Sequence, residues 1–132
     1  MTGVIRKVGW LHIADRRLLC VRTAGRGLCY IPGGKPEPGE DNVAALVREI
    51  AEELAVALVP ETIAHAGRFS APADGSPDKI VEVDAYHAEF TGTLAPGSEI
   101  AEHCFLSSAE SGAASAAVRE VLQHLKASNV ID

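Results

Sequence analysis

Apolar and polar residues alternate in short runs at the start of the chain, which is the pattern of half-buried β-strands. The runs cover residues 4–13, 18–22 and 28–31, and the segments between them are rich in Asp, Arg and Gly. Such separators favour turns. We therefore expect three strands in this part of the chain.

A loop and a helix follow these strands. Residues 32–40 contain three prolines and three glycines, which excludes a helix or a central strand and predicts a shaped loop. Residues 41–54 are predicted to be helical, with Asp41 as the N-cap because its carboxylate can accept amide protons of the first turn. The expected apolar stripe of this helix consists of Val43, Leu46, Val47, Ile50 and Leu54.

The second half of the chain predicts more strands and a last helix. Strands are expected over residues 63–70, 80–90 and 103–106, with a loop over residues 71–78. Ser111 or Ser115 is the expected cap of the last helix, whose buried face holds Ala117, Val118, Val121, Leu122 and Leu125. Residues 129–132 are expected to form a loose tail. The order of strands, helix, strands and helix predicts an α/β fold in which sheet and helices form a mixed sandwich.

Composition and length agree with a folded domain. The chain has 132 residues, of which 47% are hydrophobic and 23% charged, so we expect one compact domain over residues 1–132. The net charge of −6 argues against a surface that binds DNA or RNA duplexes. Phosphate binding would then need a metal ion or a local basic group.

The three cysteines, Cys20, Cys29 and Cys104, are odd in number and form no CxxC pair. This pattern argues against a disulfide framework or a zinc site and favours reduced thiols in a cytoplasmic protein. We find no segment typical of a signal peptide or of a membrane span.

Three carboxylates crowd the last turns of the predicted first helix. Glu49, Glu52 and Glu53 fall within an arc of about 100° beside the apolar stripe. Like charges at this spacing repel, and the C-terminal end of a helix dipole disfavours anions. A bound divalent cation removes both conflicts, and Mg²⁺ prefers carboxylate oxygens while keeping waters that phosphates can replace. The cluster therefore predicts a magnesium site.

Residues 34–56, GKPEPGEDNVAALVREIAEELAV, resemble the signature of the Nudix (MutT-like) hydrolases, G-x5-E-x7-R-E-U-x-E-E-x-G-U, in which U is a bulky aliphatic residue. The matching positions are Gly34, Glu40, Arg48, Glu49, Ile50, Glu52, Glu53 and Val56. Ala55 stands where the family usually has glycine. Either this alanine is left-handed, at a cost of about 1 kcal/mol, or the helix runs one residue longer.

The resemblance implies a Nudix fold, a mixed β-sheet between α-helices, and roles for the matched residues. Glu49, Glu52 and Glu53 would coordinate Mg²⁺, for which Mn²⁺ could substitute. Arg48 would orient these acids through salt bridges, and Glu40 would support the loop and helix or hold a further ion. The expected substrate-binding residues are Gly34, Lys35 and Glu40. Gly34 would let the backbone approach the ligand, and Lys35, with Arg26 near the loop, would offset diphosphate charge.

The implied reaction is attack of water on phosphorus, with Glu53 as the expected base and Glu99 or Glu102 as alternatives from a later loop. The implied substrate is a nucleoside diphosphate derivative: a nucleoside di- or triphosphate, including oxidised nucleotides, or a nucleotide sugar. The alternative is a nucleotide-sensing Nudix domain without turnover. The sequence leaves base and sugar specificity open, and it also leaves open whether the chain forms a homodimer.

Overall fold

The computed structural model describes residues 3–97 and 99–132. The strands and helices follow one another along the chain in this order: β1 (Val4–Trp10), β2 (Ile13–Ala14), β3 (Arg17–Thr23), β4 (Gly33–Gly34), α1 (Asn42–Leu54), β5 (Ala57–Leu58), β6 (Ala64–Ala73), β7 (Ser76–His87), β8 (Phe90–Thr91), β9 (Ile100–Leu106) and α2 (Ala116–Ala127). Short 3-10 helices cover Pro60–Thr62 and Ser108–Ala113.

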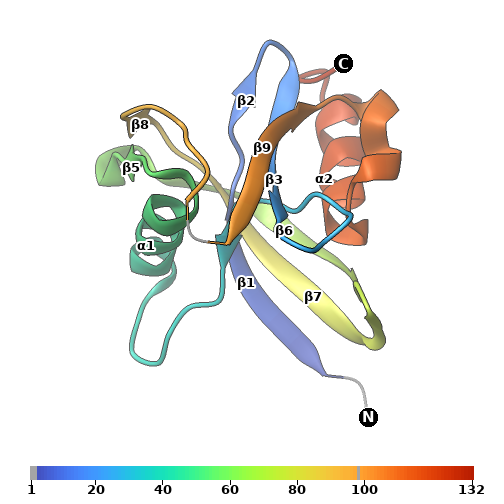
Figure 1. Cartoon of the computed structure of the whole chain (residues 1–132), viewed down its shortest axis with the longest axis horizontal. Helices are drawn as coiled ribbons and strands as arrows, with labels where there is room; N and C mark the ends of the chain where they lie inside the picture. The colour runs from blue at the N-terminus through green and yellow to red at the C-terminus, as the bar shows by residue number, and fades with distance from the viewer. Residues whose placement is uncertain (1–2, 98) are drawn as a thin grey trace.

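The strands form a mixed arrangement. The largest sheet has the order β4-β1-β7-β6, in which β1 runs parallel to β7 and the other neighbours are antiparallel. A second sheet has the order β2-β3-β9, and β5 pairs with β8. Helices α1 and α2 lie on opposite sides of the strands (Figure 1). The expected sandwich of strands between helices is therefore confirmed.

Two buried clusters hold the helices to the strands, and β3 contributes to both. Leu19 and Val21 pack in the cluster that contains Leu46, Ile50 and Leu54 of α1. Leu18 and Cys20, which alternate with them along β3, pack in the cluster of α2. Each face of a strand presents every second side chain, so one strand can bury both of its faces. The predicted burial of Val118, Val121, Leu122 and Leu125 is confirmed.

The N-terminal capping residues of both helices are among those predicted from the sequence. The Ala44 amide donates to Asp41 Oδ1 at 2.8 Å, which confirms the N-cap of α1. Of the two predicted caps of α2, Ser115 is the one used, and its Oγ accepts from the Val118 amide. The burial predicted for Val43 of α1 was wrong: Val43 is 39% exposed, because it lies in the first turn of the helix, before the first buried residue, Ala45.

The end of α1 settles the question posed by Ala55. The helix stops at Leu54, and Ala55 takes a left-handed conformation with a φ of 60°, its amide donating to Ala51 O at 3.2 Å. A side chain with a Cβ is strained in this region, and glycine is not.

Replacing Ala55 by glycine is therefore expected to stabilise the protein by about 1 kcal/mol. The midpoint of urea unfolding measures this change. Ala51→Gly is the matched control: Ala51 is exposed inside α1, where glycine costs about 1 kcal/mol, so the same replacement should have the opposite sign. Two destabilised variants would contradict the prediction.

Several predicted strands differ in their limits. The strand over residues 4–13 ends at Trp10, and β2 belongs to the other sheet. Residues 28–31 form isolated bridges to Val21 and Ala114, not a strand. Two glycines of the predicted loop over residues 32–40 instead pair with β1 as β4. The partners of β4 and of Cys29 lie far away in sequence, and local composition does not report them.

The loop predicted over residues 71–78 was wrong. β6 continues to Ala73 and β7 begins at Ser76, so only Asp74 and Gly75 form the turn. Strand pairing here overrides residues that favour turns. Pro72 is tolerated because β6 lies at the edge of its sheet, where a missing amide proton breaks no ladder.

The C-terminal tail was also predicted wrongly. Ile131 is fully buried in the cluster of α2, and the Asp132 amide donates to Arg16 O at 3.0 Å. The Arg16 guanidinium donates in turn to Asp132 Oδ1 at 2.6 Å. A buried side chain and paired backbone groups fix this end of the chain.

The three thiols are free, and Cys20 and Cys29 are buried. Burial raises the pKa of the Cys20 thiol well above its ordinary value. Within residues 3–97 and 99–132, no helix is long and apolar enough to cross a membrane.

Candidate active site

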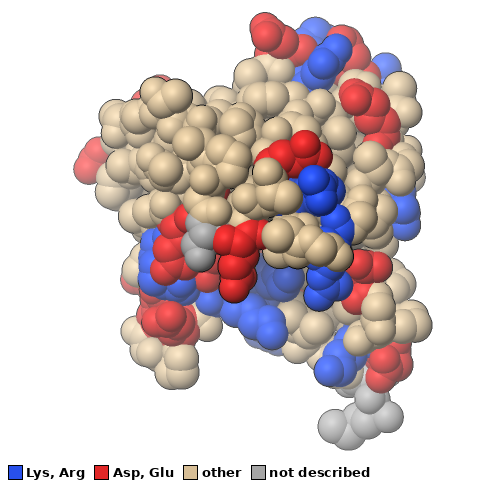
Figure 2. Space-filling model, viewed as in Figure 1, with Lys and Arg blue, Asp and Glu red and all other residues tan. Residues whose placement is uncertain are grey.

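The largest sheet, the N-terminal end of α2 and the segment before α1 enclose a cavity of about 340 Å³. Its charged lining consists of two carboxylates, Glu53 and Asp74, and three cationic side chains, Lys7, Arg26 and Lys35. Lys and Arg atoms are recessed in a hollow near the middle of one face, with acidic atoms beside it (Figure 2). A protein with a net charge of −6 therefore has a locally cationic cavity. Its volume is in the range that holds small ligands.

Helix α1 directs two carboxylates at the glycines of β4. Glu49 and Glu53 are four residues apart and so share one face of the helix. The Gly33 amide donates to Glu53 Oε1 at 2.7 Å. A Cβ on Gly34 would lie 2.5 Å from Glu49 Cδ, so glycine at this position leaves room for the carboxylate where it lies. The glycines that the sequence suggested for ligand approach thus let the backbone approach the acids.

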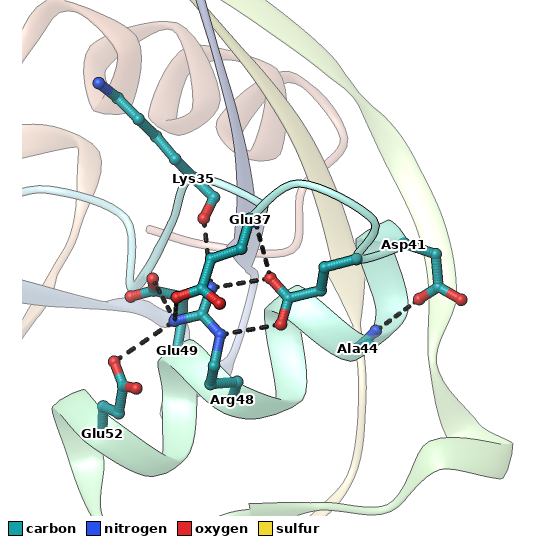
Figure 3. A network of polar contacts seen from close by, with 8 residues as sticks. Lys35, Glu37, Asp41, Ala44, Arg48, Glu49 and Glu52 are labelled. Carbon is teal, nitrogen blue, oxygen red and sulfur yellow. Dashed lines mark hydrogen bonds and ion pairs between the residues drawn. The ribbon is translucent and has the colours of Figure 1, made fainter.

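Arg48 is the centre of a charged network (Figure 3). Its Nε and Nη2 each donate to one Glu40 oxygen at 2.8 Å, and Nη1 donates to Glu49 Oε1 at 2.9 Å. Nη1 also lies 3.5 Å from Glu52 Oε2. Arg48 therefore does more than pair with Glu52 on the surface of the helix: it ties the loop to α1 and fixes Glu49.

Glu40 is held from two sides. The Glu40 carboxylate accepts hydrogen bonds from Arg48 and from the Glu37 amide. These bonds, those from Arg48 above all, lower the pKa of Glu40 to about 2. The hydrogen bonds that Arg48 donates to Glu40 and to Glu49 raise the pKa of Arg48 above its ordinary value. Arg48 Nη2 further donates to Lys35 O at 3.3 Å, while the Lys35 side chain extends away from the acids (Figure 3). Glu40 thus links the loop to the helix through Arg48, and its role in the site remains a prediction.

The pKa of the Glu53 carboxyl group is raised by its surroundings. Burial above all raises its pKa to about 7, and the negative charges of Glu49 and Glu52 raise it further, whereas the Gly33 hydrogen bond and the charge of Lys7 lower it. A buried acid that shares its surroundings with other acids lacks counter-charge when it ionises. Glu53 is therefore the position where a bound cation would relieve the most unfavourable charge.

This raised pKa makes stability depend on pH. The pKa of Glu53 is about 7 in the folded chain against an ordinary value of 4.5, so between these values the folded state binds a proton that the unfolded state releases. The free energy of unfolding of the metal-free protein is expected to fall by about 3 kcal/mol as pH rises through this window. A Glu53→Gln variant lacks the titrating group and should keep that stability.

Urea unfolding in the presence of a chelator, at pH 5 and at pH 8, measures the difference. The stability of Glu53→Gln relative to the wild type should increase by about 3 kcal/mol between the two pH values. Glu120→Gln, which removes an exposed carboxylate of α2, should follow the wild type. Parallel pH profiles for all three proteins would show that Glu53 titrates normally.

The donor set fits a hard divalent cation. Glu49 and Glu53 offer carboxylate oxygens, and Mg²⁺ commonly binds one or two carboxylates and completes its shell with water and phosphate oxygens. Within the described part of the chain, no three His, Cys, Asp or Glu side chains are gathered as a ready ligand set. Glu52 instead faces Arg48 and its side chain is 53% exposed. The joint coordination by Glu49, Glu52 and Glu53 remains a prediction.

The alternative bases lie elsewhere. Glu102 pairs with Arg22 at 3.0 Å across β3 and β9, and its side chain is 56% exposed. Glu99 is exposed in the turn before β9, with a φ of 62°. Neither belongs to the described residues that line the cavity.

Among the residues that line the cavity, sequence reasoning did not single out Lys7, Tyr30 and Asp74. Burial and the charge of Lys35 lower the pKa of the Lys7 ammonium, while Glu53 raises it. A lysine between Ile5 and Gly9 on one face of a strand is a signal that could have been used, because inward-facing strand positions are usually apolar. Asp74 carried no such signal, since Asp is ordinary in a turn.

The chain matches the NUDIX domain family over residues 5–125. Among solved structures, it is similar to the E. coli ORF135 protein, with 25% identity, a TM-score of 0.72 and coverage of 99% of this chain and 96% of that chain. It is also similar to a MutT protein from Methanosarcina mazei Go1, with 22% identity, a TM-score of 0.76 and coverage of 97% and 96%. A putative nudix hydrolase family member from Chromobacterium violaceum gives 19% identity, a TM-score of 0.75 and coverage of 95% and 78%. Comparison with curated protein sequences found no match.

Proposed function

This chain belongs to the Nudix hydrolase family, and from that premise we propose that it is a Mg²⁺-dependent pyrophosphohydrolase of nucleoside diphosphate derivatives. The substrates in view are nucleoside di- and triphosphates, including oxidised ones, and nucleotide sugars. Family membership supports hydrolysis of a phosphorus anhydride. The cavity supports the proposed metal dependence and the proposed class of substrate.

The observation that carries the proposal is the meeting of opposite charges at the cavity. Glu53 lines it, with Glu49 beside Gly34, and Lys7 and Lys35 line it as well. Ammonium groups attract the phosphate oxygens of a ligand, whereas the carboxylates would repel them unless a cation intervened. A diphosphate with its metal ion satisfies both sets of groups.

The residues divide the work of the reaction as follows. A divalent cation, when bound, polarises phosphate oxygen and lowers the pKa of bound water. Glu49, Glu52 and Glu53 would hold it, and Arg48 keeps Glu49 in position. Lys7 and Lys35 offset charge on the diphosphate.

Glu53 is the proposed base. A water oxygen attacks phosphorus, the bond from that phosphorus to the bridging oxygen breaks, and the water proton passes to the Glu53 carboxylate. The Gly33 amide fixes the orientation of this carboxylate. Glu53 is favoured over Glu99 and Glu102 because it alone of the three lines the cavity.

A substrate panel tests the function. Nucleoside triphosphates, an oxidised triphosphate and nucleotide sugars are incubated with Mg²⁺ or with Mn²⁺, and the products are identified by mass. We expect turnover that a chelator abolishes and that either cation restores. With ¹⁸O-labelled water, the product that carries the label contains the attacked phosphorus. Tight nucleotide binding without turnover of any member would favour the sensing domain.

We also propose that the protein acts in the cytoplasm. The three cysteines are free, and thiols persist in reducing compartments.

A further inference from the structure

Three polar residues meet at the cavity away from the catalytic acids: Arg26, Tyr30 and Asp74. The Tyr30 hydroxyl donates to Asp74 Oδ2 at 2.5 Å, and Arg26 Nη1 lies 3.8 Å from the same oxygen. Arg26 and Tyr30 come from the segment after β3, and Asp74 comes from the turn between β6 and β7. Residues 44 positions apart in sequence therefore form one cluster.

This cluster and the acids lie toward opposite ends of the strands that line the cavity. Gly34, which contacts Glu49, pairs with Val8, and Val8 is level with Asp84 on β7. Asp74 lies beyond Ser76, at the opposite end of the same strand. Figure 1 likewise shows the turn between β6 and β7 on the side of the molecule away from α1. A ligand whose phosphates lie at Glu53 would thus extend its other end toward Asp74.

The wall between the two ends is aliphatic. Ile31, Val81, Val83 and Val118 line the cavity together with the polar groups. Such a surface suits the flat face of an aromatic ring better than a hydroxyl-rich sugar, because it offers no hydrogen-bond partners. The position beside this wall therefore fits the base of a nucleotide.

Asp74 is held so that one oxygen is engaged and the other is available. Both contacts of its carboxylate fall on Oδ2, and Oδ1 has no hydrogen-bond partner among the described residues. Its pairing with the Tyr30 hydroxyl orients the group, and burial together with that bond raises the pKa of Tyr30, which keeps it a donor. An ionised carboxylate only accepts hydrogen bonds. The site is therefore complementary to an N–H donor and repels a carbonyl oxygen.

Resting on the proposed function, we propose that Asp74, positioned by Tyr30, selects substrates whose base carries an exocyclic amine. The amine of such a base donates to Asp74, whereas a keto group at the same position would place its lone pairs against the carboxylate. A site built to bind a hydrogen-bond donor rejects an analogue that lacks it more strongly than an apolar pocket rejects a change of size.

Matched nucleotide pairs test this selection. CTP and UTP differ by an amine against a keto group, and GTP and ITP differ by an amine against hydrogen. We expect the wild type to prefer the amine-bearing member of at least one pair by about 10-fold or more in kcat/KM. In Asp74→Asn the ratio should fall below about 3-fold, since the carboxamide offers a donor as well as an acceptor.

Two further variants test the role of Tyr30 and provide a control for the loss of a carboxylate. Tyr30→Phe, which removes only the hydroxyl that orients Asp74, should lower the ratio of kcat/KM within the preferred pair. Asp78→Asn, an exposed carboxylate near the start of β7, should leave the ratio unchanged. Ratios within a pair cancel any general loss of folded enzyme.

The outcomes separate this inference from the proposed function. Turnover with no preference in either pair, or with a preference that Asp74→Asn retains, overturns the role of Asp74 and leaves the hydrolase assignment intact. If no nucleotide is turned over, the proposed function fails, and the dissociation constants of the same four nucleotides for the wild type and Asp74→Asn still decide whether Asp74 selects the amine.

Discussion

Replacing Glu53 by glutamine is expected to lower kcat by about 10³-fold, because the variant loses both a proposed metal ligand and the proposed base. Glutamine has nearly the same shape, and its carbonyl oxygen can still accept the hydrogen bond that the Gly33 amide gives to Glu53 Oε1. The fold around α1 should therefore persist. The loss then reports chemistry at the carboxylate and not collapse of the site.

Steady-state hydrolysis of the best substrate from the panel, with saturating Mg²⁺, measures the effect. The control is Glu120→Gln, which makes the same chemical change on an exposed position of α2 and should retain wild-type kcat. Thermal or urea unfolding of both variants verifies that each is folded. If the kcat of Glu53→Gln is within about 10-fold of the wild-type value, Glu53 is not the base.

Replacing Gly33 by alanine is expected to destabilise the protein by about 3 kcal/mol or more. Gly33 has a φ of 146°, and a Cβ there would lie 2.0 Å from Val8 O. The obstacle is backbone of the paired strand, so it cannot rotate away as a side chain would. Relief requires β4 to separate from β1, which also moves the amide that holds Glu53.

The free energy of unfolding in urea measures the cost, and kcat measures the disturbance of the site. Gly112→Ala is the matched control: a Cβ there meets nothing within 4 Å, and its φ is not in the left-handed region. That variant should stay within about 0.5 kcal/mol of the wild type. Equal midpoints for the two variants would mean that the close approach of β4 to β1 does not constrain the fold.

Features that depend on neighbours in sequence could be predicted from the sequence alone. The limits of α1, its Asp41 cap and the shared face of Glu49 and Glu53 follow from helix geometry, which repeats within four residues. The Nudix signature is of the same kind, since its spacing is set within one loop and one helix. For this reason the acidic end of the site could be located from the sequence.

Features that join distant segments could not be predicted in this way. The short turn at Asp74 could not be predicted because pairing between β6 and β7 overrode residues that favour loops. The order of the tail could not be predicted because Ile131 fills a core built from other segments. Lys7 carried a signal in its strand, but nothing near it in sequence showed which groups it would face.

The sequence by itself determined the family, the sandwich of strands and helices, and the acids that α1 presents. Tertiary structure alone decided which glycine admits Glu49, where Lys7 points, and that Asp74 meets Tyr30. The physical reason is that helices and caps satisfy their hydrogen bonds locally, whereas a cavity forms where separate strands and turns are brought together by burial of apolar surface.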